Sequence, residues 1–242
     1  GSRKYVAFAD KCWPAFPSQF GFEPCYVNSR LVSRGIPVSC EVDIYGALSE
    51  YIGACVTGDA VTLLDINNSV PKYIYDEDIT GKYNYSLTDT FMGFHCGNTP
   101  ECKMCSDRAV KYQLIQHRLL EPAGSEPDFT RGTLEGDIAA SDITFYRLQC
   151  DSEGELRAYI AEGEILDVPT RSFGGIGIFA IPEMGRFYRH VLVEKRYPHH
   201  GAVAFGHYGK LLFDLFRYLG VQDIGFNQPA GMMYPTENPF VK

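Results

Sequence analysis

Two adjacent histidines stand near the end of the chain, where His199 and His200 are followed directly by Gly201. Imidazole is among the commonest ligands of metal ions in proteins, so the pair prompts a search for acidic partners earlier in the sequence. Two carboxylates are the best candidates, Glu41 and Asp65. A site with one imidazole and several carboxylate oxygens suits manganese or magnesium better than a thiolate-rich site would.

The local sequence around each carboxylate predicts the element that would position it. Apolar side chains at helical spacing over 44–55 predict a helix, with Asp43 as its N-cap and Gly58 at its end. Glu41 stands just before that cap. The apolar run 60–66 predicts a buried strand that carries the second carboxylate near its end.

Three motifs in this order, Cys-Glu-Val-Asp before a helix, Leu-Leu-Asp at a strand end and Pro-His-His-Gly near the C-terminus, resemble the family of L-fucose and L-arabinose isomerases. The resemblance runs from about Lys11 to about Val221. It implies that Glu41, Asp65 and His200 hold a divalent cation, usually Mn²⁺, with Mg²⁺ or Co²⁺ as alternatives. It also implies that the two carboxylates are catalytic.

The chemistry of such an enzyme explains these residue types. Interconverting an aldose and a ketose moves a proton between adjacent carbons through an enediol, and a divalent cation stabilises the charge that develops on its oxygens. A nearby carboxylate can carry the proton, and such acid–base catalysis typically contributes about 10²–10⁴-fold. The alternative is a sugar- or metal-binding module that keeps the fold without turnover. No further motif supplies the leaving-group acid that a metal-dependent hydrolase would need.

Each candidate also has a purely structural interpretation. Asp65 could cap a turn, because it precedes Ile-Asn-Asn. Glu41 could be a first-turn glutamate that the helix dipole favours. His199 and His200 could be turn residues bonded to the backbone. Their joint occurrence in the order of the family favours the metal site.

Four further residues are predicted to contact the sugar. His95 lies between the second acid and the final histidine pair, where the arabinose branch of the family carries another histidine, and Asn98 follows shortly after it. His199 neighbours the predicted ligand. Trp13, the single tryptophan, stands beside a proline, and it could stack on a sugar ring or cover the edge of a sheet.

A cysteine cluster suggests a separate site. Cys96, Cys102 and Cys105 include one Cys-x-x-Cys pair, a spacing that is compatible with structural zinc. A redox role is disfavoured, because the pair stands in a predicted loop without a helix N-terminus to lower a thiol pKa. With 242 residues the chain has ample core without stapling, so its eight cysteines indicate a reduced, cytoplasmic protein rather than a disulfide scaffold.

The pattern changes along the chain and predicts two units, a remnant of an α/β domain over 1–58 and a barrel-containing domain over 59–242. Segments 143–150 and 156–161 predict a hairpin, and short strands at this spacing indicate a barrel or sandwich. The family resemblance implies an antiparallel Greek-key β-barrel. The predicted fold is therefore an α/β segment followed by a mainly antiparallel barrel with a C-terminal helix, α+β overall.

The final helix is predicted over about Phe205–Leu219, with His200 just ahead of its N-terminus and Gly220 at its end. Its packing face is predicted to contain Tyr208, Leu211, Leu212, Leu215 and Leu219. In the first unit, a strand is expected at Tyr5–Ala9 and a helix near Tyr26–Ser33. A surface loop is expected at Glu121–Pro127.

The net charge and the hydropathy of the chain limit the classes of molecule that it can be expected to bind. With 22 basic and 30 acidic residues, the net charge of −8 disfavours nucleic acid and anionic membranes. No apolar run approaches the roughly 20 residues of a membrane span, which predicts a soluble protein. Gly1-Ser2 is typical of a tag remnant, and family members carry two α/β domains before this region, so we expect the C-terminal part of a longer protein. The resemblance also implies a homo-oligomer, a trimer or hexamer.

Overall fold

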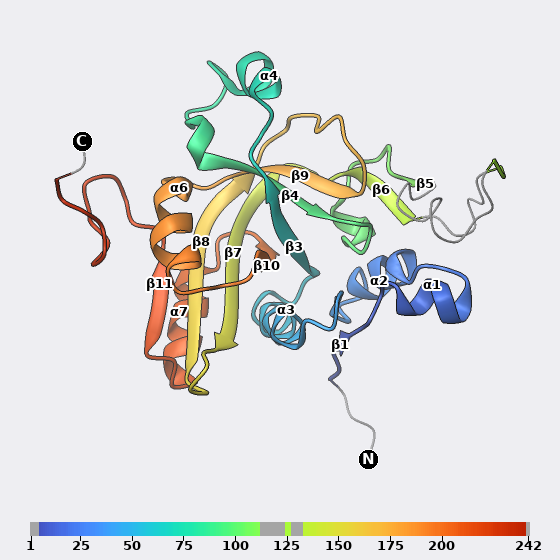
Figure 1. The fold of residues 1–242 in the computed structure, drawn as a ribbon, viewed down its shortest axis with the longest axis horizontal. Coiled ribbons are helices and arrows are strands. Elements are labelled where there is room, and N and C mark those ends of the chain that lie inside the picture. The colour runs from blue at the N-terminus through green and yellow to red at the C-terminus, as the bar shows by residue number, and fades with distance from the viewer. Residues whose placement is uncertain (1–4, 112–123, 127–132, 241–242) are drawn as a thin grey trace.

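A closed β-barrel forms the centre of the protein (Figure 1). The computed structural model describes residues 5–111, 124–126 and 133–240. Six antiparallel strands form the wall of the barrel in the order β8-β7-β10-β3-β4-β9, and pairing of β9 with β8 closes it. Their bounds are β3 Val61–Asn68, β4 Thr90–His95, β7 Ser141–Cys150, β8 Leu156–Ile165, β9 Gly175–Ala180 and β10 His200–Phe205.

Three further strands extend this sheet beyond the barrel. Asp223–Phe226 (β11) runs parallel to β8, Thr133–Asp137 (β6) runs parallel to β9, and Ala109–Lys111 (β5) pairs antiparallel with β6. The predicted hairpin is confirmed as β7 and β8, which pair over their whole length. With the helices described below, the predicted α+β fold around a mainly antiparallel barrel is confirmed.

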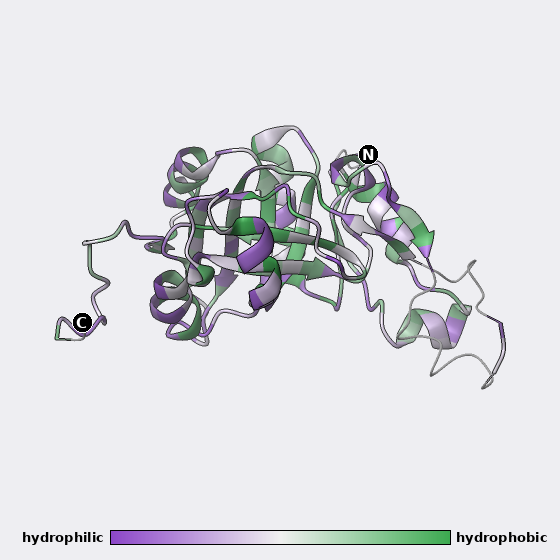
Figure 2. Ribbon diagram, turned by 90° about the horizontal axis from the view of Figure 1, so that it is seen from above, coloured by the Kyte–Doolittle hydropathy of each residue, from purple (hydrophilic) through white to green (hydrophobic). Residues whose placement is uncertain are grey.

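The strands have two buried faces, which explains why they appear in the sequence as nearly continuous apolar runs. One cluster takes a side chain from every barrel strand and therefore fills the interior; from these strands it includes Leu64, Phe91, Phe145, Tyr159, Phe179 and Val203. Alternate residues such as Tyr146 and Leu148 point outward and pack under helices. Coloured by hydropathy in Figure 2, the strands are mostly hydrophobic and the surface helices are mixed.

Helix α3 (Ile44–Thr57) packs on the outer face of the barrel, against β3, β7 and β10. The Asp43 carboxylate accepts a hydrogen bond from the Gly46 N–H at 2.8 Å, and Gly58 ends the helix with φ 67°. Both predicted helix ends are therefore confirmed. The cap matters beyond stability, because it fixes Asp43 at the end of the barrel where β10 begins.

The prediction for the final helix was partly wrong. Helix α7 is Gly209–Tyr218, shorter than expected, and its buried side chains are Leu212 and Phe216, whereas Leu211 and Leu219 are exposed. His200 does not precede a helix, because it is the first residue of β10. The segment that begins there pairs with both β3 and β7 and extends to Phe205, and Gly206 follows it with φ 127°, so the helix begins only at Gly209.

The N-terminal part forms a small parallel pair, β1 (Phe8–Ala9) with β2 (Val38–Ser39), separate from the barrel sheet. Helices α1 (Ala15–Phe20) and α2 (Cys25–Val32) connect the two strands. This strand–helix–strand arrangement agrees with the expected α/β segment. Because α3 contacts β1 and β2 as well as the barrel, the predicted boundary at residue 58 stays a prediction.

Short helices complete the described chain. They are α4 (Lys72–Ile74), the π-helical turns Tyr75–Ile79 and Tyr188–Val193, α6 (Met184–Phe187), and the 3₁₀ turns Leu87–Asp89 and Glu101–Lys103. The predicted loop Glu121–Pro127 lies largely outside the described residues. Among the helices of the described ranges, we find none with the length and apolar character to cross a membrane.

Candidate metal centre and active site

The register of three neighbouring strands brings the predicted ligands together. His200, the first residue of β10, pairs with Asp65 on β3, and Asp65 pairs with Phe94 on β4. His95 is the last residue of β4. Because these strands alternate in direction, β10 begins at the end of the barrel where β3 and β4 carry these residues.

The distances in this group are short enough for a shared ligand. His200 Nε2 lies 2.9 Å from Asp65 Oδ1 and 3.7 Å from Glu41 Oε2. The ligating atoms of Glu41, His95 and His200 all lie within 4.8 Å of one another, and so do those of Asp65, His199 and His200. The structure thus brings together all three predicted metal ligands and two of the predicted sugar contacts.

Two buried atoms at this point lack hydrogen-bond partners, namely Asp65 Oδ1 and His200 Nε2. They are close to each other, but their orientation does not meet hydrogen-bond geometry. A buried polar group left unpaired costs about 1–3 kcal/mol, so such atoms in one place indicate a missing partner. A carboxylate oxygen and an imidazole nitrogen, with the Glu41 carboxylate beside them, fit a divalent cation of the manganese class.

The far side of the His200 ring determines which nitrogen is available. Its Nδ1 lies 2.9 Å from the Asp43 carboxylate and donates to it, which leaves the lone pair of neutral His200 on Nε2. Arg147 in turn donates two hydrogen bonds to Asp43, at 2.7 and 2.8 Å. A carboxylate behind a ligating histidine fixes the tautomer and the ring orientation. Asp43 and Arg147 therefore position His200.

The charges in this network shift several pKa values. Burial opposes ionisation of Asp43, but bonds from His200 and Arg147 outweigh it and hold its pKa well below the ordinary value. Burial also opposes the charge on His200, yet Asp43 and Asp65 raise its pKa to about 9, so a cation that binds Nε2 must displace the proton there. For Asp65, burial is outweighed by His200, His95 and His199, so its pKa is lowered. Asp65 thus stays ionised at neutral pH.

His95 presents the opposite tautomer. Its ring is buried, with 1% of the residue exposed, and burial lowers its pKa, so the ring is neutral. The Cys96 N–H donates to Nδ1 at 3.0 Å, which places the proton of the neutral ring on Nε2. That Nε2 is buried and has no partner. His95 therefore offers a hydrogen-bond donor to the site rather than a lone pair, as a sugar contact requires.

Glu41 stands on an unusual backbone turn. Glu41 and Val42 have φ values of 64° and 59°, two consecutive non-glycine residues in the left-handed region. Such residues cost about 1–3 kcal/mol each and occur mainly at functional sites. The Val42 N–H donates to the Asp10 carbonyl at 2.9 Å, which holds the turn. Because α3 begins only at Ile44, the interpretation of Glu41 as a first-turn residue is excluded.

The other predicted sugar contacts are placed less directly. Asn98 is buried and donates to the Val38 carbonyl at 3.3 Å, while its Oδ1 has no partner. Trp13 is half-buried in the loop between β1 and α1. His199 is mostly exposed, with Nε2 3.4 Å from Asp65 Oδ1. The roles of Asn98 and Trp13 stay predictions.

The predicted zinc cluster does not come together in the described chain. Cys96, Cys102 and Cys105 are absent from the groups of close ligating side chains that the described residues form. A different group with two cysteine thiols does form, from Asp10, Cys12 and Cys40, for which the sequence analysis predicted no metal site.

Two functional residues were missed at the sequence level. Asp43 was identified only as a helix cap, and Arg147 was not identified at all. A signal for Arg147 exists, since it is the one charged residue in the mostly apolar run 143–150, which is a predicted strand. A buried charge needs a partner, and here that partner is Asp43.

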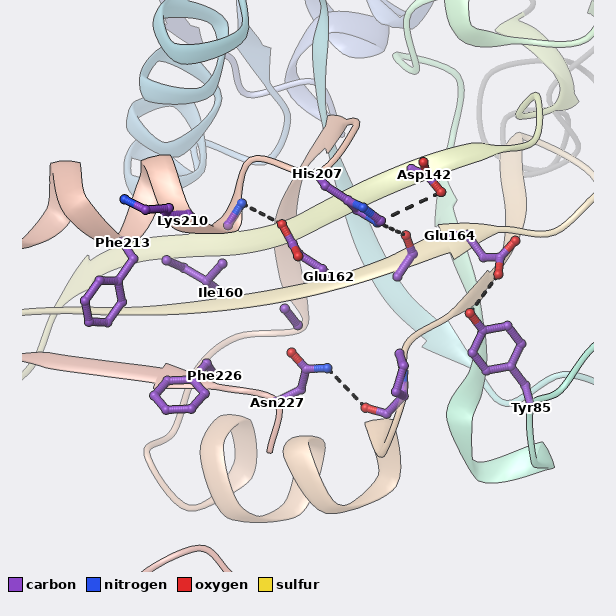
Figure 3. A pocket seen from close by; sticks show the side chains of 14 residues that line it. Tyr85, Asp142, Ile160, Glu162, Glu164, His207, Lys210, Phe213, Phe226 and Asn227 are labelled. Carbon is purple, nitrogen blue, oxygen red and sulfur yellow. Dashed lines mark hydrogen bonds and ion pairs between the residues drawn. The ribbon is translucent and has the colours of Figure 1, made fainter. Parts of the chain in front are cut away.

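A cavity lies away from the His200 site, on the outer face of β8 between α7 and β11 (Figure 3). This outer cavity has a volume of about 730 Å³ and shares no residue with the ligand group. Its polar side chains bind the protein itself. Glu162 accepts from the Gly209 N–H at 2.7 Å, and Tyr85 donates to Glu164 at 2.7 Å.

Comparison with known proteins agrees with this picture. The family model of the L-fucose isomerase C-terminal domain matches residues 93–225, more than half of the chain. The barrel fold is thus that of an L-fucose isomerase C-terminal domain. The chain belongs to the L-fucose isomerase family through this C-terminal domain, and the matched range includes His95 and His200.

Individual relatives are similar over most of the chain. A sulfoquinovose isomerase from Clostridium sp. (strain MSTE9) is 28% identical over 179 residues, which cover 73% of this chain and 34% of the relative. A sulfoquinovose isomerase from Priestia megaterium is 25% identical over 232 residues, covering 91% of this chain and 44% of the relative. The chain thus spans less than half the length of these relatives.

Proposed function

We propose that this protein is a metal-dependent aldose–ketose isomerase whose site is formed by Glu41, Asp65 and His200. The observation that carries the proposal is the pair of buried, unpartnered atoms, Asp65 Oδ1 and His200 Nε2, beside the Glu41 carboxylate. Family membership and relatives named as sugar isomerases support it. We propose Mn²⁺ as the cation, with Mg²⁺ or Co²⁺ as alternatives, because the donors are mainly oxygen with one imidazole.

A bound divalent cation would act as a Lewis acid that stabilises negative charge on the two sugar oxygens next to the reacting carbons. The residues of the chain then supply position and proton transfer. His200, held by Asp43, presents Nε2. Asp65 stays ionised because three histidines surround it.

Proton transfer is assigned to the two carboxylates. Glu41 is the accessible one, with 52% of its side chain exposed, and its strained turn directs it toward His200. A sugar entering the site therefore meets Glu41 first. One carboxylate can take the proton from the first carbon and return it to the neighbouring one. His95 Nε2–H would donate to a sugar oxygen and so orient the reacting carbons.

Sulfoquinovose is the first substrate to test, because two relatives carry that name. L-Fucose and L-arabinose come next through the family resemblance. To test this, the full-length protein is incubated with Mn²⁺ and each aldose, and the formation of the ketose is measured. We expect turnover of at least one sugar, lost on chelation and restored by Mn²⁺. Saturable sugar binding without ketose would instead show a non-catalytic binding module.

We also propose that the protein is a homo-oligomer, a trimer or hexamer. An exposed aromatic group at the surface of α1 supports an interface, since the Phe16 ring lies 5.2 Å from the Phe20 ring and 5.9 Å from that of Phe22. Sedimentation of the purified protein tests this. All eight cysteines are free, which supports a reducing, cytoplasmic location.

A further inference from the structure

A second group of ligating side chains lies beneath the Glu41 turn. Strands β1 and β2 run parallel, with Ala9 opposite Ser39, so the residues that follow them emerge side by side. Asp10 and Cys12 follow β1, and Cys40 follows β2. One ligating atom of each of these three residues lies within 4.8 Å of the other two.

The two thiols of this group are buried, and Asp10 is partly buried. Cys12 is 7% exposed and Cys40 is fully buried. Asp10 Oδ2 accepts a hydrogen bond from Asn28 Nδ2 at 2.8 Å, which orients the carboxylate. The other oxygen, Oδ1, is buried and has no partner. A buried carboxylate oxygen beside two thiols is therefore left unsatisfied by the protein itself, as Asp65 Oδ1 is at the first site.

We propose that Asp10, Cys12 and Cys40 form a second metal site that binds a thiophilic divalent cation of the zinc class. Zinc takes Cys sulfur at about 2.3 Å and carboxylate oxygen at about 2.0–2.2 Å in a tetrahedron, so two bound sulfurs lie roughly 3.8 Å apart. The three ligating atoms already lie within 4.8 Å of one another, which is the range that such a site needs. Two sulfurs and one oxygen complete three positions, and water would take the fourth.

The donor chemistry separates this site from the first one. Glu41, Asp65 and His200 offer hard oxygens and one imidazole, whereas the second group offers two soft sulfurs, which select zinc over manganese or magnesium. A disulfide between Cys12 and Cys40 would need an external oxidant, and both cysteines are free. The metal site needs no such reactant.

The position of the second site gives it a function. The Asp10 carbonyl accepts the Val42 N–H that holds the strained turn. The Cys12 thiol contacts both the Cys40 thiol and the backbone N–H of Glu41. A cation bound by Asp10, Cys12 and Cys40 would therefore tie β1 to β2 and hold the turn that carries Glu41. The inference concerns metal binding and does not depend on which sugar, if any, is isomerised.

The test measures zinc and manganese by mass spectrometry in the full protein, purified without chelators and then given both metals. We expect one zinc and one manganese per chain. Cys12→Ser and Cys40→Ser should each lower zinc content at least about tenfold, since the ligand set is lost, while manganese content, still supported by Asp65 and His200, should fall less than zinc content. Cys25→Ser is the matched control, a buried thiol outside the group, and it should keep both metals.

The reciprocal variant Asp65→Asn should lose manganese and keep zinc, so failure of the first site is distinguishable from failure of the second. If the cysteine variants do not fold, wild-type protein loaded with Co²⁺ should show a thiolate-to-cobalt charge-transfer band in the near ultraviolet. Protein that folds but takes up no zinc and shows no such band overturns the inference. So does zinc that is lost from Asp65→Asn but retained in Cys12→Ser.

Discussion

The outer cavity and the His200 site differ in whether their polar side chains already have hydrogen-bond partners within the protein. The outer cavity is roomy, about 730 Å³, yet its carboxylates Glu162 and Glu164 already accept hydrogen bonds from the protein (Figure 3). The site at Asp65 and His200 lies outside that cavity, but its polar atoms converge without partners. The first arrangement is complete by itself, and the second needs a ligand. Unsatisfied donors and acceptors, rather than volume, single out the candidate functional site.

Exchanging one carboxylate in each region tests this contrast with the largest expected effect. Asp65→Asn should lower kcat by about 10²–10⁴-fold, because it removes both a ligand and a proton carrier. Glu162→Gln, which keeps an acceptor for the Gly209 N–H, should leave kcat within about twofold, the usual scatter for a residue remote from the chemistry. Initial rates of ketose formation decide the matter. A greater loss in Glu162→Gln would move the active site to the outer cavity.

The carboxylate behind His200 should have the next largest effect. Asp43→Asn retains a good helix cap but removes the charge that orients the imidazole, so Mn²⁺ affinity should fall about 10–100-fold. Titration calorimetry measures the affinity, and circular dichroism confirms the fold. The variant also leaves Arg147 without its charged partner, so its thermal stability should fall too. Unchanged affinity in a folded protein would contradict the positioning role.

Glu50 refines the comparison, because it is a buried carboxyl group that belongs to none of the groups of close ligating side chains in the described chain. It is fully buried in α3, neither carboxylate oxygen has a hydrogen-bond partner, and burial raises its pKa to about 8. Where a carboxyl group has a higher pKa in the folded state than in the unfolded state, the free energy of unfolding of the protein falls as the pH rises. From pH 4.5, the ordinary value, to about 8 the folded state binds the extra proton.

Over that pH range, Glu50 should therefore lower the free energy of unfolding by about 1.4 kcal/mol per pH unit. Glu50→Gln should remove this component of the slope, becoming more stable than the wild type at pH 8 and similar to it at pH 4.5. Urea unfolding of both proteins across this range measures the difference. Parallel stability curves for the two proteins would show that Glu50 is ionised in the fold.

The smallest expected effect separates the two buried histidines. His95→Gln should leave Mn²⁺ affinity within about threefold and lower kcat/KM roughly 2–13-fold, the equivalent of one hydrogen bond of about 0.5–1.5 kcal/mol. The reason is that the neutral His95 ring keeps its proton on Nε2, whereas Nε2 of His200 becomes available to a cation that displaces its proton. Parallel metal titrations and steady-state kinetics measure both quantities. A loss of metal affinity in His95→Gln comparable to that in His200→Ala would make His95 a ligand.

The sequence was sufficient to predict which three candidate ligands lie close together, but not all of the residues that position them. Glu41, Asp65 and His200 could be named because short motifs and strand ends are local patterns. Arg147 could not be linked to Asp43, because their contact joins β7 to the start of α3 and depends on tertiary packing. The start of the final helix was misplaced for a similar reason, since Phe205 pairs within β10 and Gly206, with φ 127°, separates the strand from the helix.

The same limit applies to the second metal group. Cys12 and Cys40 are far apart in sequence and match no short motif, and only the parallel pairing of β1 and β2 brings them together. The Cys-x-x-Cys spacing of Cys102 and Cys105 was conspicuous by comparison. Yet in the part of the chain that the structure describes, those two cysteines do not join a group of ligands.

The most direct test of the account is Mn²⁺ binding by the wild type beside a Glu41→Gln, His200→Ala double variant, with Glu162→Gln as the control from the outer cavity. The account predicts one Mn²⁺ per chain in the wild type and in the control, and loss of that binding in the folded double variant. Equal stoichiometry and affinity in all three proteins would contradict it.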